Sequence, residues 1–173
     1  MKTNTTDKTL RLVLTGLMTA VVTVCVMALP IPIPMTTGYV NLGDGIIFLS
    51  VMLLGWKYGA FAGGVGAALA DILLGAAAWA PWTLVIKAGM AMILGLMLKL
   101  PTKTDKAVSF REILGMILAT AFMTGGYYLA ESVMYGNWMA PMVGIPWNLL
   151  QGAVGAVIAS ALSIALKNRR LLK

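Results

Sequence analysis

The chain has 173 residues, of which 60% are hydrophobic and only 11% are charged, and its mean hydropathy is +0.88. A soluble domain carries about 25% charged residues, so this composition excludes an ordinary soluble protein. Residues 1–173 are expected to form a single transmembrane domain. The length allows about six crossings of roughly 20 residues each, with little left for a domain outside the bilayer.

Apolar runs separated by Pro and Gly predict an all-α membrane protein, a six-transmembrane-helix bundle with both termini cytoplasmic. The expected helices cover residues 10–29, 43–55, 58–76, 81–100, 110–135 and 146–166. Pro30, Pro32 and Pro34 stop the first helix. Pro81 and Pro146 each suit the first turn of a helix, where the missing N–H has no intrahelical partner to lose.

The distribution of the 13 Lys and Arg residues predicts the orientation of the bundle. All but Lys87 fall at the termini or in the second and fourth connections: Lys2, Lys8, Arg11, Lys57, Lys99, Lys103, Lys106, Arg111, Lys167, Arg169, Arg170 and Lys173. The other connections, at residues 30–42, 77–80 and 136–145, carry none and are therefore expected to face outward. The net charge of +7 thus reflects topology and attraction to anionic lipid rather than a nucleic-acid surface.

The basic start, the apolar run and the small residue Ala28 are also typical of a cleavable signal peptide. Cleavage would leave five helices, whereas the charge pattern requires a first crossing from inside to outside. A retained first helix is therefore the preferred interpretation. Cys25 within it is the single cysteine, which forbids an internal disulfide.

Two charged residues, Asp71 and Lys87, lie inside apolar segments, where an unpaired charge is costly. Both are expected roughly 8 to 9 Å below the outer boundary, at 1.5 Å of rise per residue. Their helices are joined by a short loop and should be antiparallel neighbours. The sequence therefore predicts an intramembrane ion pair between Asp71 and Lys87, which either pins two helices together or contacts a ligand.

Further polar side chains are expected in the outer third of the bundle. Asp44 starts the second helix, and Glu131 stands one turn before the outer end of the fifth. Asn148 and Gln151 are spaced i and i+3, hence on one face of the last helix. Two amides on an apolar helix need partners in a dry bundle, which favours a functional role. For Asp44 the simpler alternative is a helix cap.

Aromatic residues are expected at the same depth. Tyr127 and Tyr135 share a helix face with Glu131. Four Trp residues fall at the same level: Trp79, Trp82, Trp138 and Trp147. A belt at the lipid interface is the simpler interpretation of these rings. Together with the carboxylates and amides they also predict an outward-facing pocket for a small, flat, polar molecule, bound by stacking and hydrogen bonds.

The sequence contains no His, no phosphate-binding G-x-x-x-x-G-K-[ST] motif, no metal-ligand cluster and no nucleophile with an adjacent base. These absences argue against an enzyme and against ATP hydrolysis by this chain. We expect no cofactor and no metal.

Four segments carry a family resemblance: GYVNLGD at 38–44, GWKYG at 55–59 with the Gly/Ala-rich stretch up to Asp71, WAPWTLVIK at 79–87 and PWNLLQG at 146–152. The chain resembles the substrate-binding S components of energy-coupling factor (ECF) vitamin transporters over nearly its whole length. It is most similar to the branch assigned to hydroxymethylpyrimidine, the thiamin precursor, or to pyridoxine.

The resemblance implies a subunit of a bacterial cell membrane that captures a vitamin or its precursor at the outer face. Its implied partners are a transmembrane coupling subunit and two cytoplasmic ATPases. Gly16 and Ala20 match the family's Ala-xxx-Ala docking motif as a small-residue variant, although internal packing is the alternative for such a pair. The ligand is implied to lie beneath the first and third external loops.

The candidate substrate-binding residues are Asn41, Asp44, Trp79, Trp82, Lys87, Glu131, Tyr135, Trp138, Asn148 and Gln151. The amides of Asn148 and Gln151 would hydrogen-bond the ligand, Glu131 or Asp44 would accept from it, and one or more Trp rings would stack on it. Lys87 would bind an anionic or hydroxyl group, or only neutralise Asp71. Two other classes stay open, a self-sufficient small carrier or channel and a structural membrane protein.

Overall fold

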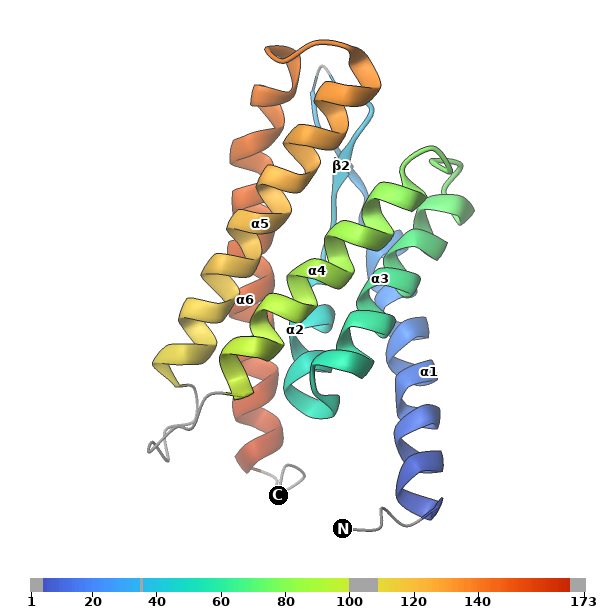
Figure 1. The fold of residues 1–173 in the computed structure, drawn as a ribbon, viewed down its shortest axis with the longest axis vertical. Helices are drawn as coiled ribbons and strands as arrows, with labels where there is room; N and C mark the ends of the chain where they lie inside the picture. The colour runs from blue at the N-terminus through green and yellow to red at the C-terminus, as the bar shows by residue number, and fades with distance from the viewer. Residues whose placement is uncertain (1–4, 35, 100–108, 169–173) are drawn as a thin grey trace.

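The computed structural model describes residues 5–34, 36–99 and 109–168, and it is a bundle of six α-helices (Figure 1). The helices are α1 (Thr5–Ala28), α2 (Gly43–Leu54), α3 (Trp56–Leu73), α4 (Ala80–Lys99), α5 (Phe110–Tyr135) and α6 (Gly144–Asn168). Two short strands, β1 (Ile31–Pro32) and β2 (Tyr39–Val40), pair antiparallel between α1 and α2, and a 3-10 helix, η1 (Ala140–Val143), precedes α6. All six predicted helices are present, whereas the hairpin and η1 were not predicted.

Four helical segments of the described chain are long and apolar enough to cross a bilayer: Lys8–Ala28, Ala80–Lys99, Phe110–Tyr135 and Ala140–Leu166. The 12 residues of α2 extend only about 18 Å, less than a hydrocarbon core of about 30 Å. The helix α3 has 18 residues, but its glycines and Asp71 lower its hydropathy. The chain is an all-α membrane protein in which α2 is shorter, and α3 less apolar, than an ordinary membrane-spanning helix.

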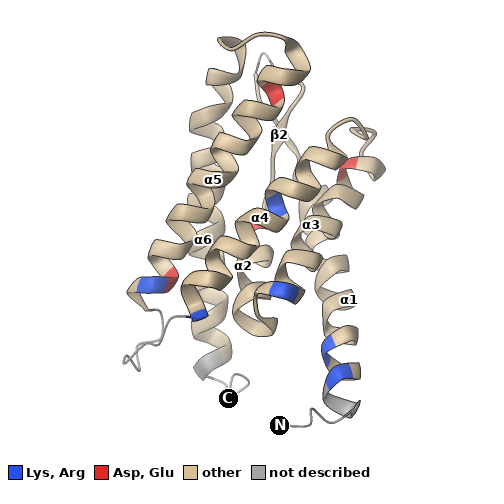
Figure 2. Cartoon of the chain, in the orientation of Figure 1, with Lys and Arg blue, Asp and Glu red and all other residues tan. Residues whose placement is uncertain are grey.

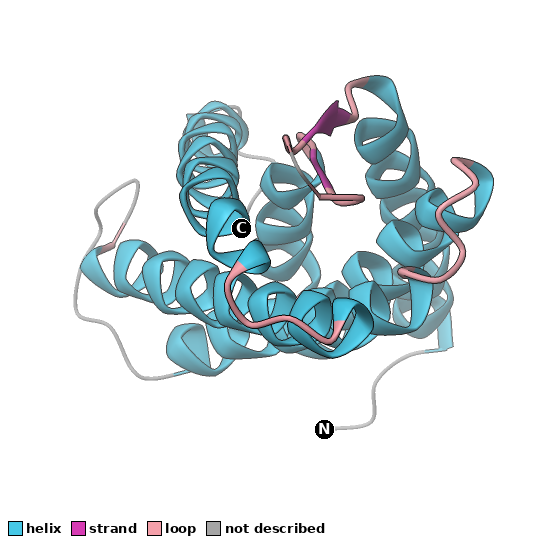
Figure 3. Cartoon of the chain, turned by 90° about the horizontal axis from the view of Figure 1, so that it is seen from above, coloured by secondary structure: helices cyan, strands magenta, loops and turns pink. Residues whose placement is uncertain are grey.

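The hairpin occupies the space that the short helix α2 leaves open. The sequence predicted an external loop at residues 30–42, but Ile33 and Val40 are buried. Seen from above, the strands lie between the helices of the bundle (Figure 3). The connection from α1 therefore enters the bundle before α2 begins, and this brings loop residues next to helix side chains.

The helix ends follow local chemistry. Gly55, with φ of 86°, separates α2 from α3, and Gly136, with φ of 61°, ends α5. Both positive angles favour glycine because it lacks a Cβ. Ser109 and Glu112 form a reciprocal capping box at the start of α5. Pro146 lies in the first turn of α6, as predicted, although the helix begins two residues earlier.

The helix α1 packs against α2 and α3 on one side only. A Cβ at Gly66 of α3 would lie 2.8 Å from the Thr19 carbonyl oxygen, and the Thr23 hydroxyl donates to the Gly66 carbonyl over 2.9 Å. The Gly/Ala-rich face of α3 thus permits the close approach of α1. Gly16 and Ala20 are exposed, and a Cβ at Gly16 would meet nothing within 4 Å. This glycine is therefore not used for packing inside the described chain.

Cationic residues gather towards one end of the long axis of the bundle (Figure 2). Except for Lys87 in α4, the described Lys and Arg residues lie towards the end where α1 begins. Acidic residues are not confined to one end, because Glu112 lies in the first turn of α5 beside Arg111, whereas Asp71 and Glu131 lie in the last turns of α3 and α5. The hairpin, the α3–α4 turn and η1 gather at the end opposite to the cations (Figure 1). The predictions for Lys2, Lys103, Lys106, Arg169, Arg170 and Lys173 concern positions outside the described residues.

Candidate ligand-binding site

A pocket lies among five helices and the hairpin segment, by which we mean the described residues 29–34 and 36–42 between α1 and α2. Its lining residues are Val26, Ile33, Gly38, Tyr39, Asn41, Ala67, Asp71, Trp79, Thr83, Lys87, Tyr127, Glu131 and Asn148. The mixture of aromatic rings, carboxylates and an amide suits a compact polar ring.

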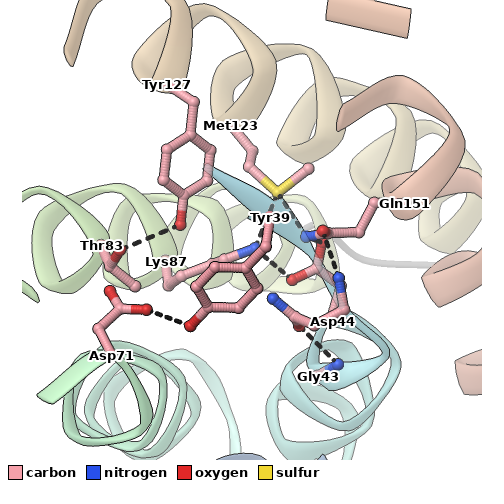
Figure 4. Close-up of polar contacts among 10 residues, drawn as sticks. Tyr39, Gly43, Asp44, Asp71, Thr83, Lys87, Met123, Tyr127 and Gln151 are labelled. Carbon is pink, nitrogen blue, oxygen red and sulfur yellow. Dashed lines mark hydrogen bonds and ion pairs between the residues drawn. The ribbon is translucent and has the colours of Figure 1, made fainter. Parts of the chain in front are cut away.

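A buried ion pair joins Lys87, which lines the pocket, to Asp44 (Figure 4). The Lys87 Nζ lies 2.5 Å from Asp44 Oδ1, and both side chains are at most 1% exposed. The second oxygen, Oδ2, accepts from Gln151 Nε2 over 2.7 Å, and Gln151 Oε1 accepts from the Asn41 backbone N–H over 2.8 Å. Both Asp44 oxygens are thus satisfied, as a buried charge requires, and the network joins α2, α4, α6 and the hairpin segment.

The predicted ion pair between Asp71 and Lys87 is wrong, because Lys87 pairs with Asp44 instead. Asp71 accepts a hydrogen bond from the Tyr39 hydroxyl. The physical reason is that α2 begins inside the bundle rather than at its outer boundary, so Asp44 is buried beside Lys87. The alternative role of Asp44 as a helix cap is also wrong, since no side chain caps α2 at its N-cap residue. Asn41 Oδ1 accepts from the Gly43 backbone N–H over 2.9 Å.

Lys87 has two further contacts. Its Nζ lies 3.0 Å from Met123 Sδ and 5.4 Å from the centroid of the Tyr127 ring. A lysine ammonium has three donors, of which Asp44 and the sulfur accept two. The charge of the ammonium is offset by Asp44, although the Lys87 side chain lines the pocket.

The aromatic wall consists of Trp79, Tyr127 and Tyr39. The Trp79 and Tyr127 rings are tilted by 55° with centroids 6.2 Å apart, and the Tyr127 hydroxyl donates to Thr83 Oγ1 over 3.3 Å. The Tyr39 hydroxyl donates a hydrogen bond to Asp71.

Glu131 and Asn148 lie on α5 and α6 at the side of the pocket. The Asn148 Nδ2 donates to the Gly144 carbonyl over 3.0 Å. Glu131 is 2% exposed, and its Oε2 is buried without a hydrogen-bond partner in the described chain. A Cβ at Gly38 would lie 3.0 Å from Glu131 Oε1. The absence of a side chain on Gly38 thus makes room for this carboxylate beneath the hairpin segment.

The structure divides the ten candidate residues into three groups. Five line the pocket, namely Asn41, Trp79, Lys87, Glu131 and Asn148, and two, Asp44 and Gln151, lie directly behind it in the ion-pair network. Trp82, Tyr135 and Trp138 are not among the lining residues. Trp82 and Trp138 are exposed, in keeping with an interface belt, and the Tyr135 hydroxyl accepts from the Thr37 backbone N–H over 2.9 Å.

Sequence reasoning did not include Tyr39, Thr83 and Tyr127 among its candidates, although all three line the pocket. Signals for two of them were available. Tyr127 is one turn before Glu131, and Thr83 is one turn before Lys87 on the same helix face. Tyr39 carried no such signal, because its position depends on the unpredicted hairpin.

A model of the family described as ECF-type riboflavin transporter, S component, matches residues 6–168. A Lactococcus lactis subsp. cremoris (strain MG1363) protein, the thiamine precursor transporter HmpT, is 29% identical over 163 residues, which cover 94% of this chain and 90% of that protein. A Pyrococcus woesei protein, described as "Uncharacterized protein in gap 3'region", is 39% identical over 148 residues, which cover 86% of this chain and 95% of that protein. The chain belongs to the family of ECF-type riboflavin transporter S components.

Proposed function

We propose that this chain is the substrate-capture subunit of an ECF-type importer, binding a small vitamin or vitamin precursor at the outer face of a cell membrane. The observation that carries the proposal is the pocket between the helices and the hairpin, with aromatic walls and buried acceptors. A site of this kind suits a small polar ring better than an ion or a long chain. The chain itself would bind, and partner ATPases would supply the energy.

The distribution of charge supports an orientation for this function. We propose six crossings in one transmembrane domain, with both termini in the cytoplasm. The described cations other than Lys87 lie towards the end of the termini (Figure 2), and the positive-inside rule assigns that end to the cytoplasm. The pocket is lined in part by the hairpin segment, which is at the opposite end (Figure 1). The ligand would therefore enter from outside, with α2 and the hairpin segment together completing the second crossing.

The proposed ligand is hydroxymethylpyrimidine, with pyridoxine as the second candidate. Support comes from the aromatic and polar residues that line the pocket and from the thiamine precursor transporter HmpT, which is similar to this chain over 94% of its length. Both candidates are single six-membered rings with short alcohol substituents. Such rings can stack on Trp79 or Tyr127 and donate to the carboxylates.

The proposed partners are a transmembrane coupling subunit and two cytoplasmic ATPases, with the exposed Gly16 and Ala20 face of α1 as the docking surface. A self-sufficient carrier would instead move the ligand in vesicles that contain this chain alone. A structural membrane protein would bind no vitamin.

The experiment is isothermal titration of the purified chain in detergent, stripped of carried-over ligand, against hydroxymethylpyrimidine, pyridoxine, thiamin and riboflavin. We expect tight binding of one small ring. Asn148→Ala should weaken it by about tenfold or more, because a buried amide partner is lost. Trp138→Phe, at an exposed position outside the pocket, is the control and should bind normally. A folded chain that binds none of the four compounds would contradict the proposed function.

A further inference from the structure

Two carboxylates in the pocket wall have oxygens that no group of the described chain satisfies. These are Asp71 Oδ2 on α3 and Glu131 Oε2 on α5. The two residues are only 4% and 2% exposed, and both line the pocket. Buried acceptors without partners are rare in folded proteins and costly when they persist. Their position therefore indicates that the partners come from a bound molecule.

The charges around the pocket do not balance. Among the described residues, Lys87 is the only cation that lines it, and its ammonium is neutralised by Asp44 at 2.5 Å. Met123 Sδ accepts a second hydrogen bond from this ammonium. Asp71 receives one hydrogen bond from Tyr39, but no salt bridge joins Asp71 or Glu131 to a cation of the described chain. The pocket thus offers acceptors and negative charge, with no free cation for an anionic ligand.

From this imbalance we infer that the site selects a neutral or cationic ring carrying N–H and O–H donors for both Glu131 and Asp71, and that it rejects the phosphate ester of the same ring. The inference rests on the proposed function and deepens it, because it states which chemical form of the ligand is captured. An amino group with a neighbouring hydroxymethyl group provides such donors. A phosphate would meet two carboxylates without a cation to offset its charge.

The reaction that uses the imported ring follows from the same chemistry. If the ring is captured without phosphate, any phosphate that it carries in metabolism must be added after entry. The class of enzyme that consumes the product of this transporter is therefore a kinase acting on a hydroxymethyl group. Phosphorylation would also prevent return through the same pocket, since the ester is the form that the carboxylates repel.

The test compares Kd values of the purified full-length chain for 4-amino-5-hydroxymethyl-2-methylpyrimidine, its monophosphate, and the analogue with hydrogen in place of the amino group. Pyridoxine and pyridoxine 5′-phosphate form a second pair. We expect the parent ring to bind at least about 100-fold more tightly than its ester, and removal of the amino group to weaken binding about 10- to 100-fold. An ester that binds as tightly as its parent overturns the inference.

Two variants test whether Glu131 and Asp71 cause the selectivity for the parent ring over its ester. Glu131→Gln and Asp71→Asn keep the size of each side chain but remove its charge and one acceptor, so each should weaken binding of the parent ring about 10- to 100-fold. Each should also lower the ratio of the ester Kd to the parent Kd, because one source of repulsion of the phosphate is removed. A residue with only a structural role would not change this ratio. The matched control is Glu112→Gln at the start of α5, because Gln also serves in a capping box. It should leave both affinities unchanged.

The outcomes separate the inference from the proposed function. Tight binding of a parent ring together with unchanged selectivity in both Glu131→Gln and Asp71→Asn leaves the proposed function standing and overturns the inference. A chain that binds neither parent nor ester contradicts the proposed function, and the inference falls with it. The ratio of parent to ester affinity in the unaltered chain tests the inference even if a variant fails to fold.

Discussion

Lys87 and Asp44 show how a charge is accommodated inside this protein. Both are fully buried, and the pair is held by Gln151 as well as by its own contact. Sequence reasoning placed the charged residues at the correct ends of their helices but paired Lys87 with Asp71. The sequence gives the position of a residue along its helix, whereas pairing also depends on the rotation of α4 and on how deep in the bundle α2 begins. Rotation and depth follow from packing against residues distant in the sequence, and the charge pattern carries no information on that packing.

Removal of one partner should cost much more than removal of both. We expect Lys87→Met to lower the free energy of unfolding by about 3 to 5 kcal/mol, because it leaves the Asp44 carboxylate buried without a cation. The double variant Lys87→Met with Asp44→Leu should recover a large part of that loss. Thermal unfolding in detergent measures both, with the exposed Lys57→Met as the control for loss of a lysine. Equal stability of Lys87→Met and the unaltered chain would show that the pair is not needed.

At the scale of elements, the hairpin is the part that the sequence did not predict. Three prolines and the absence of cations correctly suggested a break at residues 30–42. They gave no sign that the segment enters the bundle, because its two strands have only two residues each and no alternating pattern that could be detected. The six helices were predictable because long apolar runs with Pro and Gly at their ends constrain them locally.

The hairpin segment is also tied to α5 through Tyr135, whose hydroxyl lies 2.9 Å from the Thr37 nitrogen and 2.5 Å from Thr37 Oγ1. Tyr135→Phe removes both contacts. We expect faster hydrogen exchange of the Thr37 amide and a stability loss of about 0.5 to 1.5 kcal/mol, the usual worth of a hydrogen bond.

Tyr128→Phe is the matched control for this change. It removes a tyrosine hydrogen bond to the Trp138 carbonyl in the connection between α5 and α6 and does not touch the hairpin segment. Exchange at Thr37 should not respond to it. If both variants accelerate that exchange equally, the tie through Tyr135 is not what protects the amide.

At the scale of the whole molecule, the family was predictable from four short segments distributed along the chain, and the family match over residues 6–168 confirms it. The number of crossings was inferred from the alternation of cations. Only four helical segments of the described chain have the length and hydropathy of ordinary spans, because α2 is short and α3 is rich in glycine. Six crossings and cytoplasmic termini therefore stay predictions.

The exposed face of α1 leads to a prediction about assembly. Gly16→Leu places a bulky side chain where a Cβ would meet nothing within 4 Å, so the fold and the pocket should tolerate it. On the proposed docking surface it should reduce co-purification with a coupling subunit and ATP-dependent uptake by about tenfold or more, since small residues permit close helix approach. Binding of the ligand by the isolated chain should not change.

Gly125→Leu is the control on another face. Gly125 is an exposed glycine of α5 with nothing within 4 Å of a Cβ, and its substitution should leave uptake intact. If Gly16→Leu assembles and transports normally while Gly125→Leu does not, the docking surface lies on α5 rather than on α1.

The hairpin segment contributes Ile33, Gly38, Tyr39 and Asn41 to the pocket wall, and side-chain hydrogen bonds join it to α3, α5 and α6 through Tyr39, Thr37 and Asn41. A molecule held in the pocket would be released at the rate at which these bonds open together. Residence time would then depend on the hairpin more than on the contacts that recognise the ring. A variant such as Tyr135→Phe would shorten occupancy without altering which molecule is preferred.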